Sequence, residues 1–318
     1  MVLASSLISA FSSFPKVGSL WRKYEHLQKS GKEYSLIYIG SSRVYHEFIP
    51  QEFDAALGAR GHHVKSLNFG QDAMWPPESF YMLRQILKAK PKGLRWVFIE
   101  VMPVNPVPPG FEFSQRFIYW HDWKHTWIAL RNMMADNVKG QRTIEEKAGH
   151  TWIHLGLWWQ RFSHAGKGCE RLQIALNLDR EKKAAPLMDA GFEKGKMGPL
   201  RGEELVTFKN HIARLRTVQP TPILPAFRDA LADVAADVRA VGAEPIFVVS
   251  SNTRARERFS DWPPTGVTMF AFDDPDKFPA LYDPNHRCDV AHLDPLAAQE
   301  FTRLLAERFA KYLERNPQ

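Results

Sequence analysis

The sequence predicts an α/β protein: a three-layer α/β/α sandwich around a five-stranded parallel sheet, flavodoxin-like in order, with a helical insertion. Short apolar runs of strand length alternate with amphipathic runs of helix length. The composition is that of a globular chain, because 44% of its 318 residues are hydrophobic and 24% are charged. The stretch from about 105 to 220 is too long for an ordinary crossover and must contain helices of its own.

The first half of the chain supplies three strands and two helices. Strands are predicted at about 34–39, 63–68 and 95–101, the last one stopped by Pro103. A short helix after Pro50 includes residues 53–57. A second helix spans about 77–89, since prolines favour the first turn of a helix and Pro91 cannot continue one.

The second half supplies two strands and two helices. A helix at about 225–241 has apolar residues on one face and ends at Gly242, and strands follow at 245–250 and 267–271. The last helix, about 295–312, has an apolar face that we expect to pack against the sheet. Strands separated by helices pair in parallel, and such sheets bind ligands at the carboxyl ends of their strands.

This order divides the chain into three segments. Residues 1–104 form the first half of the core, 105–220 a helical cap, and 221–318 the second half of the core. Helices are predicted within the cap at about 113–138, 141–163, 168–180 and 200–217. We interpret the cap as a lid on the core rather than as an independent domain.

Charge and tryptophan concentrate in the insertion. The chain carries a net charge of +7, and residues 111–220 hold 18 Lys/Arg against 12 Asp/Glu and six of the ten tryptophans. Such a segment can contact a membrane surface, an anionic glycan or a protein, and it also fits a helical insertion with a solvated basic face. No nucleic-acid-binding motif is present, so we expect no nucleic-acid partner.

The sequence also bears on the compartment. No apolar run approaches the ~20 residues of a membrane span, and residues 1–14 lack the basic start of a signal peptide. The two cysteines, Cys169 and Cys288, are too few for a disulfide framework. We therefore expect a cytoplasmic protein, with association with the cell envelope as the alternative.

Two short motifs carry the chemistry. The first strand ends in Gly40-Ser41-Ser42-Arg43, and Asp289-Val290-Ala291-His292 precedes the last helix. A serine becomes a nucleophile when a histidine takes its proton, and an aspartate three residues before that histidine can orient it. The motifs thus predict Ser42, His292 and Asp289 as nucleophile, base and orienting acid. The alternative is that Asp289 caps a turn and His292 packs at a helix start.

These motifs resemble the SGNH (GDSL-like) hydrolase superfamily. Gly40-Ser41-Ser42 is similar to its first block, with Ser41 where the family usually has Asp, and Asn68-Phe69-Gly70 is similar to its second. The Gly-Ser-Ser form resembles a subgroup of envelope acyl-transfer and esterase proteins. The resemblance implies a serine esterase or O-acyl transferase without cofactor or metal. The implied substrate is an acylated small molecule or glycan, and a polysaccharide is one possible glycan. It also implies oxyanion donors from the Ser42 and Gly70 amides.

This sequence departs from the third block of that family. No Gly-x-Asn follows the third strand, and Asn105 is the nearest amide that could complete the oxyanion hole. Arg43 and Glu100 are candidates for substrate binding; the alternative is that Glu100 pairs with Arg43 or Arg95. The missing block also leaves open a catalytically weak or inactive SGNH-like scaffold used for binding or assembly. A nucleotide-binding loop is the weakest alternative, because the motif lacks phosphate-cradling glycines.

Histidine and tryptophan patterns in the insertion remain. His121/His125 and His150/His154 have the i,i+4 spacing of two metal ligands on one helix, but no third ligand is evident, so packing histidines are expected. Trp120, Trp123 and Trp127 have the spacing of a buried helical stripe. The alternative is that they form a sugar-binding platform on a cap.

Overall fold

The computed structural model has one five-stranded sheet, and all of its strands are parallel. It describes residues 18–89, 91–104, 107, 115–135, 143–163, 187, 189–217, 223–251, 253 and 266–316. The strands lie in the order β2-β1-β3-β4-β5. Their bounds are β1 Leu36–Gly40, β2 Ser66–Gly70, β3 Trp96–Glu100, β4 Glu244–Val249 and β5 Thr268–Ala271. The predicted fold class and all five strands are confirmed.

Side chains of the strands alternate between two hydrophobic cores, one on each face of the sheet. Ile37 and Ile39 of β1 enter the first core, whereas Leu36 and Tyr38 enter the second. The first three strands are buried at every position, as in a sheet covered on both faces. The sheet therefore needs helices on both sides.

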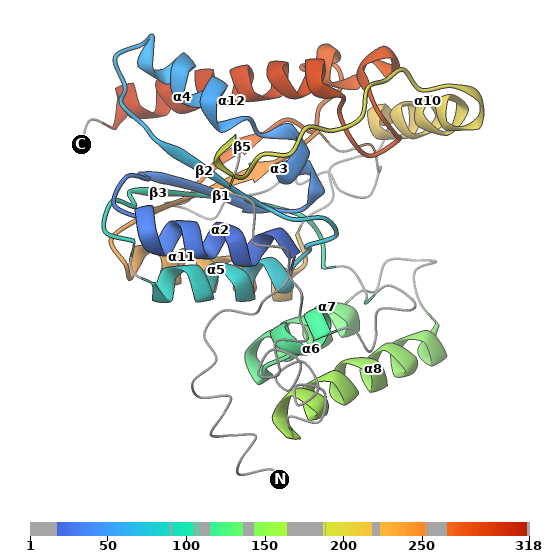
Figure 1. Ribbon diagram of the computed structural model, residues 1–318. Coiled ribbons are helices and arrows are strands. Elements are labelled where there is room, and N and C mark those ends of the chain that lie inside the picture. The colour runs from blue at the N-terminus through green and yellow to red at the C-terminus, as the bar shows by residue number, and fades with distance from the viewer. Residues whose placement is uncertain are drawn as a thin grey trace, which may run out of the picture.

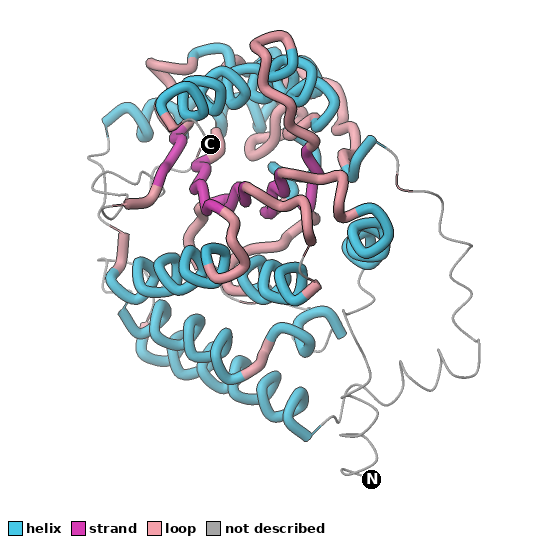
Figure 2. Tube along the Cα trace, turned by 90° about the vertical axis from the view of Figure 1, so that its left-hand side faces the viewer, coloured by secondary structure: helices cyan, strands magenta, loops and turns pink. Residues whose placement is uncertain are grey.

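Helices supply these two covers (Figures 1 and 2). The first core is covered by α2 (Gly18–Ser30), α5 (Glu78–Lys88) and α11 (Pro225–Arg239). The second is covered by α4 (Pro50–Gly58), α12 (Pro295–Arg315) and α10 (Gly202–Thr217), with the short α3 (Ser42–Glu47) at one end. Short 3-10 turns occur at Asp189–Gly191, Pro279–Tyr282 and Pro284–His286.

Most predicted helices are confirmed, with three differences. The predicted helix at 113–138 is two helices, α6 (Gln115–Trp120) and α7 (Trp123–Ala135), whereas α8 (Ile144–Ser163) matches its prediction. The one predicted at 168–180 lies outside the described residues. Neither α2 nor α3 was predicted. None of the described helices is both long and apolar enough to cross a lipid bilayer.

The described parts of the insertion pack in two different places. Helices α6 and α7 pack on α5 and α11, and α8 packs on α6 and α7, so the three helices lie beyond the first core (Figure 1). Residues 189–200 instead run beside α3, and α10 adds Phe208 and Ile212 to the second core. The lid interpretation therefore does not describe α6–α8, which cover a helical layer and not the strand ends.

Gly70, the last residue of β2, makes the close approach of α3 to the sheet possible. A Cβ there would lie 2.2 Å from Tyr45 N and 2.7 Å from Val44 C, both backbone atoms of α3. We expect Gly70→Ala to lower the free energy of unfolding by about 3 kcal/mol, the upper range for overpacking, because α3 must shift. Urea unfolding measures it.

Gly58 is the matched control. It lies at the end of α4, and an added Cβ would meet nothing within 4 Å. Gly58→Ala should change stability by less than about 1 kcal/mol, in the stabilising direction. Equal unfolding midpoints for Gly70→Ala and the wild type would contradict the close packing of α3 on β2.

Candidate active site

The strand order places a crevice at the end of β1. The chain leaves β1 for β2 on one side and returns to β3 on the other, and ligands bind at such switch points, outside the carboxyl ends of the strands. Ser41 and Ser42 directly follow β1, and Glu100 is the last residue of β3. The sequence motifs therefore lie where a doubly wound sheet places its ligands.

A hydrogen bond from the end of β3 holds the turn after β1. The Ser41 N–H donates to Glu100 Oε2 at 2.6 Å, and the Ser41 Oγ accepts the Arg43 N–H as the N-cap of α3. A Cβ on Gly40 would lie 2.5 Å from Glu100 Oε2, so only glycine fits there. These contacts make Ser42 the first residue of α3.

Ser42, His292 and Asp289 form one hydrogen-bonded chain. The distance from Ser42 Oγ to His292 Nε2 is 2.7 Å, and from His292 Nδ1 to Asp289 Oδ2 it is 2.8 Å. Since a carboxylate only accepts, Nδ1 carries the ring proton, and Nε2 accepts the Ser42 hydroxyl. This is the tautomer that a general base requires.

Asp289 also shapes the turn that carries the histidine. Its Oδ1 accepts the N–H groups of Ala291 at 2.7 Å and of His292 at 2.9 Å. Burial alone would raise the pKa of Asp289, but these bonds and the His292 ring lower it to about 2. The aspartate therefore stays ionised at neutral pH, and it fixes both the backbone and the ring of His292.

Helix α3 holds the histidine from both sides. Arg43 Nε donates to the Ala291 carbonyl at 3.5 Å, and Glu47 Oε1 accepts the Leu293 N–H at 3.0 Å. The residues before and after His292 are thus bound to the helix that begins with Ser42. One short helix thus holds Ser42 and His292 in register.

Glu47 is fully buried beside the histidine, and sequence reasoning missed it. Its Oε2 has no hydrogen-bond partner among the described residues. Burial raises the pKa of Glu47 to about 7, against the opposing effects of the His292 ring and the Leu293 N–H. Burial also lowers the pKa of His292, but the Asp289 bond and the Glu47 charge outweigh it and raise the pKa above its ordinary 6.5.

Glu47 should make stability depend on pH. A pKa of about 7 instead of the ordinary 4.5 means that the folded chain binds the proton more tightly, so stability is lost as pH rises from about 4.5 through 7. The difference corresponds to about 3 kcal/mol. We expect Glu47→Gln to remove this loss, measured by urea unfolding at pH 4.5 and 8, and to keep an acceptor for the Leu293 N–H.

The control is Glu145→Gln, which changes an exposed carboxylate in the first turn of α8. It should leave the pH dependence of stability as in the wild type. If Glu47→Gln shows the same dependence as the wild type, then burial does not raise the pKa of Glu47.

The predicted oxyanion donors have different outcomes. The Ser42 N–H begins a helix and has no intrahelical partner, so it is available. The Gly70 N–H is not free in this arrangement, because it donates to the Asn68 Oδ1 at 2.8 Å, so its role as an oxyanion donor stays a prediction. Asn105 lies outside the described residues. Ser42 is therefore the predicted donor that the described residues support.

Arg43 and Glu100 do not line an open substrate pocket. Glu100 is 2% exposed, and its two oxygens accept the Ser41 N–H and, at 3.2 Å, the Ser250 hydroxyl. These contacts, rather than an Arg43 or Arg95 pairing, join the ends of β1, β3 and β4. Arg43 is also buried and donates to the Ala291 carbonyl. Both side chains are buried in this arrangement and bind backbone of the site, and their role in substrate binding stays a prediction.

Residues 189–200 form an extended strap along the site. The Glu193 N–H donates to the Tyr45 carbonyl at 3.1 Å, and the His46 Nδ1 donates to the Glu193 carbonyl at 2.8 Å. A Cβ on Gly195 would lie 3.7 Å from the Leu293 carbonyl. The strap therefore runs from α3 to the loop that carries His292, so it borders the candidate site, whereas the described helices α6–α8 do not.

The insertion histidines are packing residues. His121 Nε2 lies 2.9 Å from His154 Nδ1, and the His125 Nδ1 donates to the Asp122 carboxylate at 2.6 Å. All three histidines are buried between helices. Within the described ranges, no three or more His, Cys, Asp or Glu side chains are grouped to hold a metal ion.

Comparisons with known proteins found no relative of this chain. No protein-family model, no curated protein and no solved structure matches the chain.

Proposed function

We propose that this chain is a serine-dependent acyl ester hydrolase or O-acyl transferase of SGNH type. The observation that carries the proposal is the Ser42–His292–Asp289 chain, with hydrogen bonds of 2.7 and 2.8 Å and the histidine in the tautomer of a base. The substrate class is an acyl ester of a small molecule or a glycan. No cofactor or metal takes part in the proposed reaction.

The steps follow from the hydrogen bonds. Ser42 Oγ attacks the acyl carbonyl while His292 Nε2 takes its proton, and Asp289 stabilises the imidazolium that forms. The Ser42 N–H donates to the developing oxyanion. His292 then gives the proton to the leaving alcohol, and water or an acceptor alcohol releases the acyl group by the reverse sequence.

Exposure of the site favours hydrolysis over transfer. The His292 side chain is 26% exposed and that of Asp289 is 43% exposed among the described residues. Water can therefore reach the acyl-enzyme, whereas a transferase must exclude it so that an alcohol wins.

The direct test is turnover of p-nitrophenyl acetate and p-nitrophenyl butyrate by the whole chain, with and without added glycerol as acceptor. We expect a burst of p-nitrophenol equal to the enzyme concentration, followed by hydrolysis. The absence of both burst and turnover for either ester would support the alternative, a catalytically weak or inactive scaffold. The observation that favours this alternative is that, of the two predicted donors within the described residues, the Gly70 N–H is already bound to the Asn68 Oδ1.

The rate should fall as the pH is lowered through the pKa of His292. This pKa is raised, so the midpoint of the acid limb of kcat/KM should lie above pH 6.5. Glu47→Gln removes one of the negative charges that raise it, so the midpoint should move to lower pH. A pH profile of kcat/KM for both proteins checks this. An unchanged midpoint would show that the Glu47 charge does not raise the pKa of His292.

A further inference from the structure

Helix α8 has an apolar face that the described residues leave uncovered. Positions 144, 148, 152, 155, 159 and 162 recur with helical spacing, and all six are apolar: Ile144, Ala148, Trp152, Leu155, Trp159 and Phe162. The opposite face buries His154 and Leu157. A helix that is apolar on both faces and covered on one has an unpartnered surface.

The exposed side chains are large and aromatic. Trp152 is 79% exposed, Phe162 62% and Trp159 57%. The surface continues onto α7, because Trp123 stacks on Trp127 with ring centroids 5.9 Å apart and meets Trp158 of α8 at 5.7 Å. We call Trp123, Trp127, Trp152, Trp158, Trp159 and Phe162 the aromatic face. Such contiguous apolar surface marks a protein or membrane contact.

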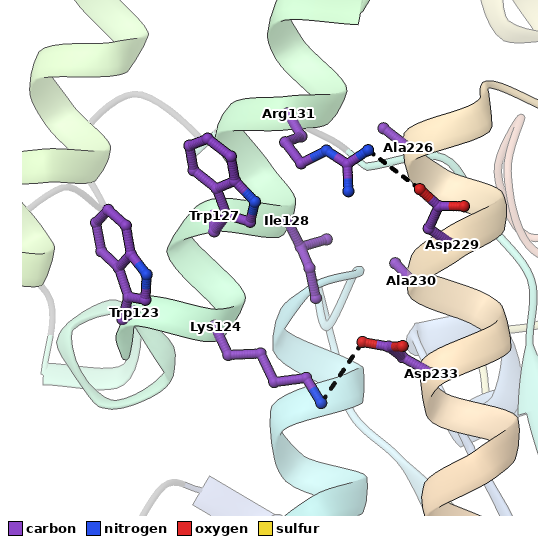
Figure 3. Close-up of a pocket in the computed structure, with 9 residues that line it drawn as sticks. All are labelled: Trp123, Lys124, Trp127, Ile128, Arg131, Ala226, Asp229, Ala230 and Asp233. Carbon is purple, nitrogen blue, oxygen red and sulfur yellow. Dashed lines mark hydrogen bonds and ion pairs between the residues drawn. The ribbon is translucent and has the colours of Figure 1, made fainter.

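The border of the aromatic face carries balanced charge. A hollow of about 270 Å³ between α7 and α11 has the two indoles of Trp123 and Trp127 on one side (Figure 3). On the other side, Lys124 pairs with Asp233 at 3.6 Å and Arg131 with Asp229 at 3.1 Å. Two cations face two anions there, so the net charge of this border is zero and does not favour a strongly anionic partner.

The position and shape of the face suit a flat partner. In Figure 1, α8 is the outermost helix, on the side of α6 and α7 that faces away from the sheet. The apolar positions of α8 span 19 residues, or about 27 Å of helix. A planar surface can therefore contact the whole stripe without meeting the α/β core.

We propose that the aromatic face docks this protein on a zwitterionic phospholipid surface. Tryptophan favours the boundary between headgroups and acyl chains, where its ring is buried and its N–H stays hydrated. An amphipathic helix lies in that plane with Trp, Phe and Leu toward the acyl chains. The hollow offers cations for a lipid phosphate and, for its ammonium group, carboxylates and indole faces.

The test is co-sedimentation of the whole chain with phosphatidylcholine vesicles. The wild type should bind, also in 0.5 M NaCl, and the double variant Trp152→Ser/Trp159→Ser should bind at least tenfold more weakly. Both positions are exposed, so the variant should keep its unfolding midpoint. Leu296→Ser is the control: Leu296 is 52% exposed on α12, away from α8, and its loss should leave binding unchanged.

Three results would overturn the proposal. They are no binding of the wild type to phosphatidylcholine, equal binding of the double variant, or binding only to phosphatidylglycerol that 0.5 M NaCl abolishes. A wild type that sediments as a dimer, ignores vesicles and becomes monomeric in the double variant would instead assign the face to a second copy of the chain. The proposal does not depend on the activity of Ser42.

Discussion

Ser42→Ala should lower kcat for p-nitrophenyl acetate by about 10⁴–10⁶-fold and leave the fold intact. In the proposed mechanism the hydroxyl is the group that attacks, and its hydrogen bond of 2.7 Å to His292 Nε2 activates it. Its loss removes covalent catalysis and leaves only binding and the oxyanion contact. Initial rates on purified protein measure the effect, and a thermal melt shows that α3 still forms.

Ser41→Ala is the matched control, because it removes the neighbouring hydroxyl. The Ser41 Oγ caps α3 by accepting the Arg43 N–H, so its loss should cost about 1 kcal/mol of stability and less than tenfold in rate. If Ser41→Ala is the inactive variant and Ser42→Ala retains activity, the nucleophile is Ser41 and the assignment is wrong.

Asp289→Asn should lower kcat by about 10⁴-fold. The amide can donate to His292 Nδ1 and so favours the tautomer in which Nε2 carries the proton, which leaves no acceptor for the Ser42 hydroxyl. The change also removes the charge that stabilises the imidazolium. Activity measured above the acid limb of the wild-type pH profile isolates this effect from titration.

Asp294→Asn is the matched control, and it tests whether the loss of another carboxylate of this loop lowers the rate as much. Asp294 caps α12 by accepting the N–H groups of Leu296 and Ala297, and asparagine is an equally good N-cap. We expect a change in rate of less than threefold. Similar losses for Asp289→Asn and Asp294→Asn would indicate a disturbed loop rather than a lost orienting acid.

The strand-end motifs were predictable because each lies within four residues of chain. Glycine and two serines after an apolar strand, and an aspartate three residues before a histidine, carry their geometry locally. The parallel sheet then brings them together. Glu47 was not predictable, because its contact with Leu293 joins positions 246 residues apart and depends on how α12 packs. Nothing in its own helix indicates a buried carboxylate.

Two other predictions failed for identifiable physical reasons. The second block predicted a free Gly70 amide, but the Asn68 side chain folds back to accept it. The spacing of Trp120, Trp123 and Trp127 predicted one buried stripe. The helix breaks between α6 and α7, so Trp120 is buried at 3% exposure while Trp123 and Trp127 face outward. Periodicity cannot reveal such a break when no proline or glycine marks it.

The placement of the insertion also depends on tertiary contacts. Its helices were predictable from their periodicity. The sequence does not indicate that α6 and α7 pack on α5 and α11, with α8 outside them, while residues 189–200 border the site. The distinction matters for function, since it separates the aromatic face from the candidate active site. Each can then be tested without disturbing the other.

Labelling with a fluorophosphonate, followed by mass spectrometry of the modified peptide, tests the central claim most directly. The reagent reacts with a serine only when a base activates it. The wild type should carry one adduct on Ser42, Ser41→Ala should label normally, and Ser42→Ala and His292→Ala should not label. An unlabelled wild type, or an adduct that persists in Ser42→Ala, would contradict the assignment of Ser42 as an activated nucleophile.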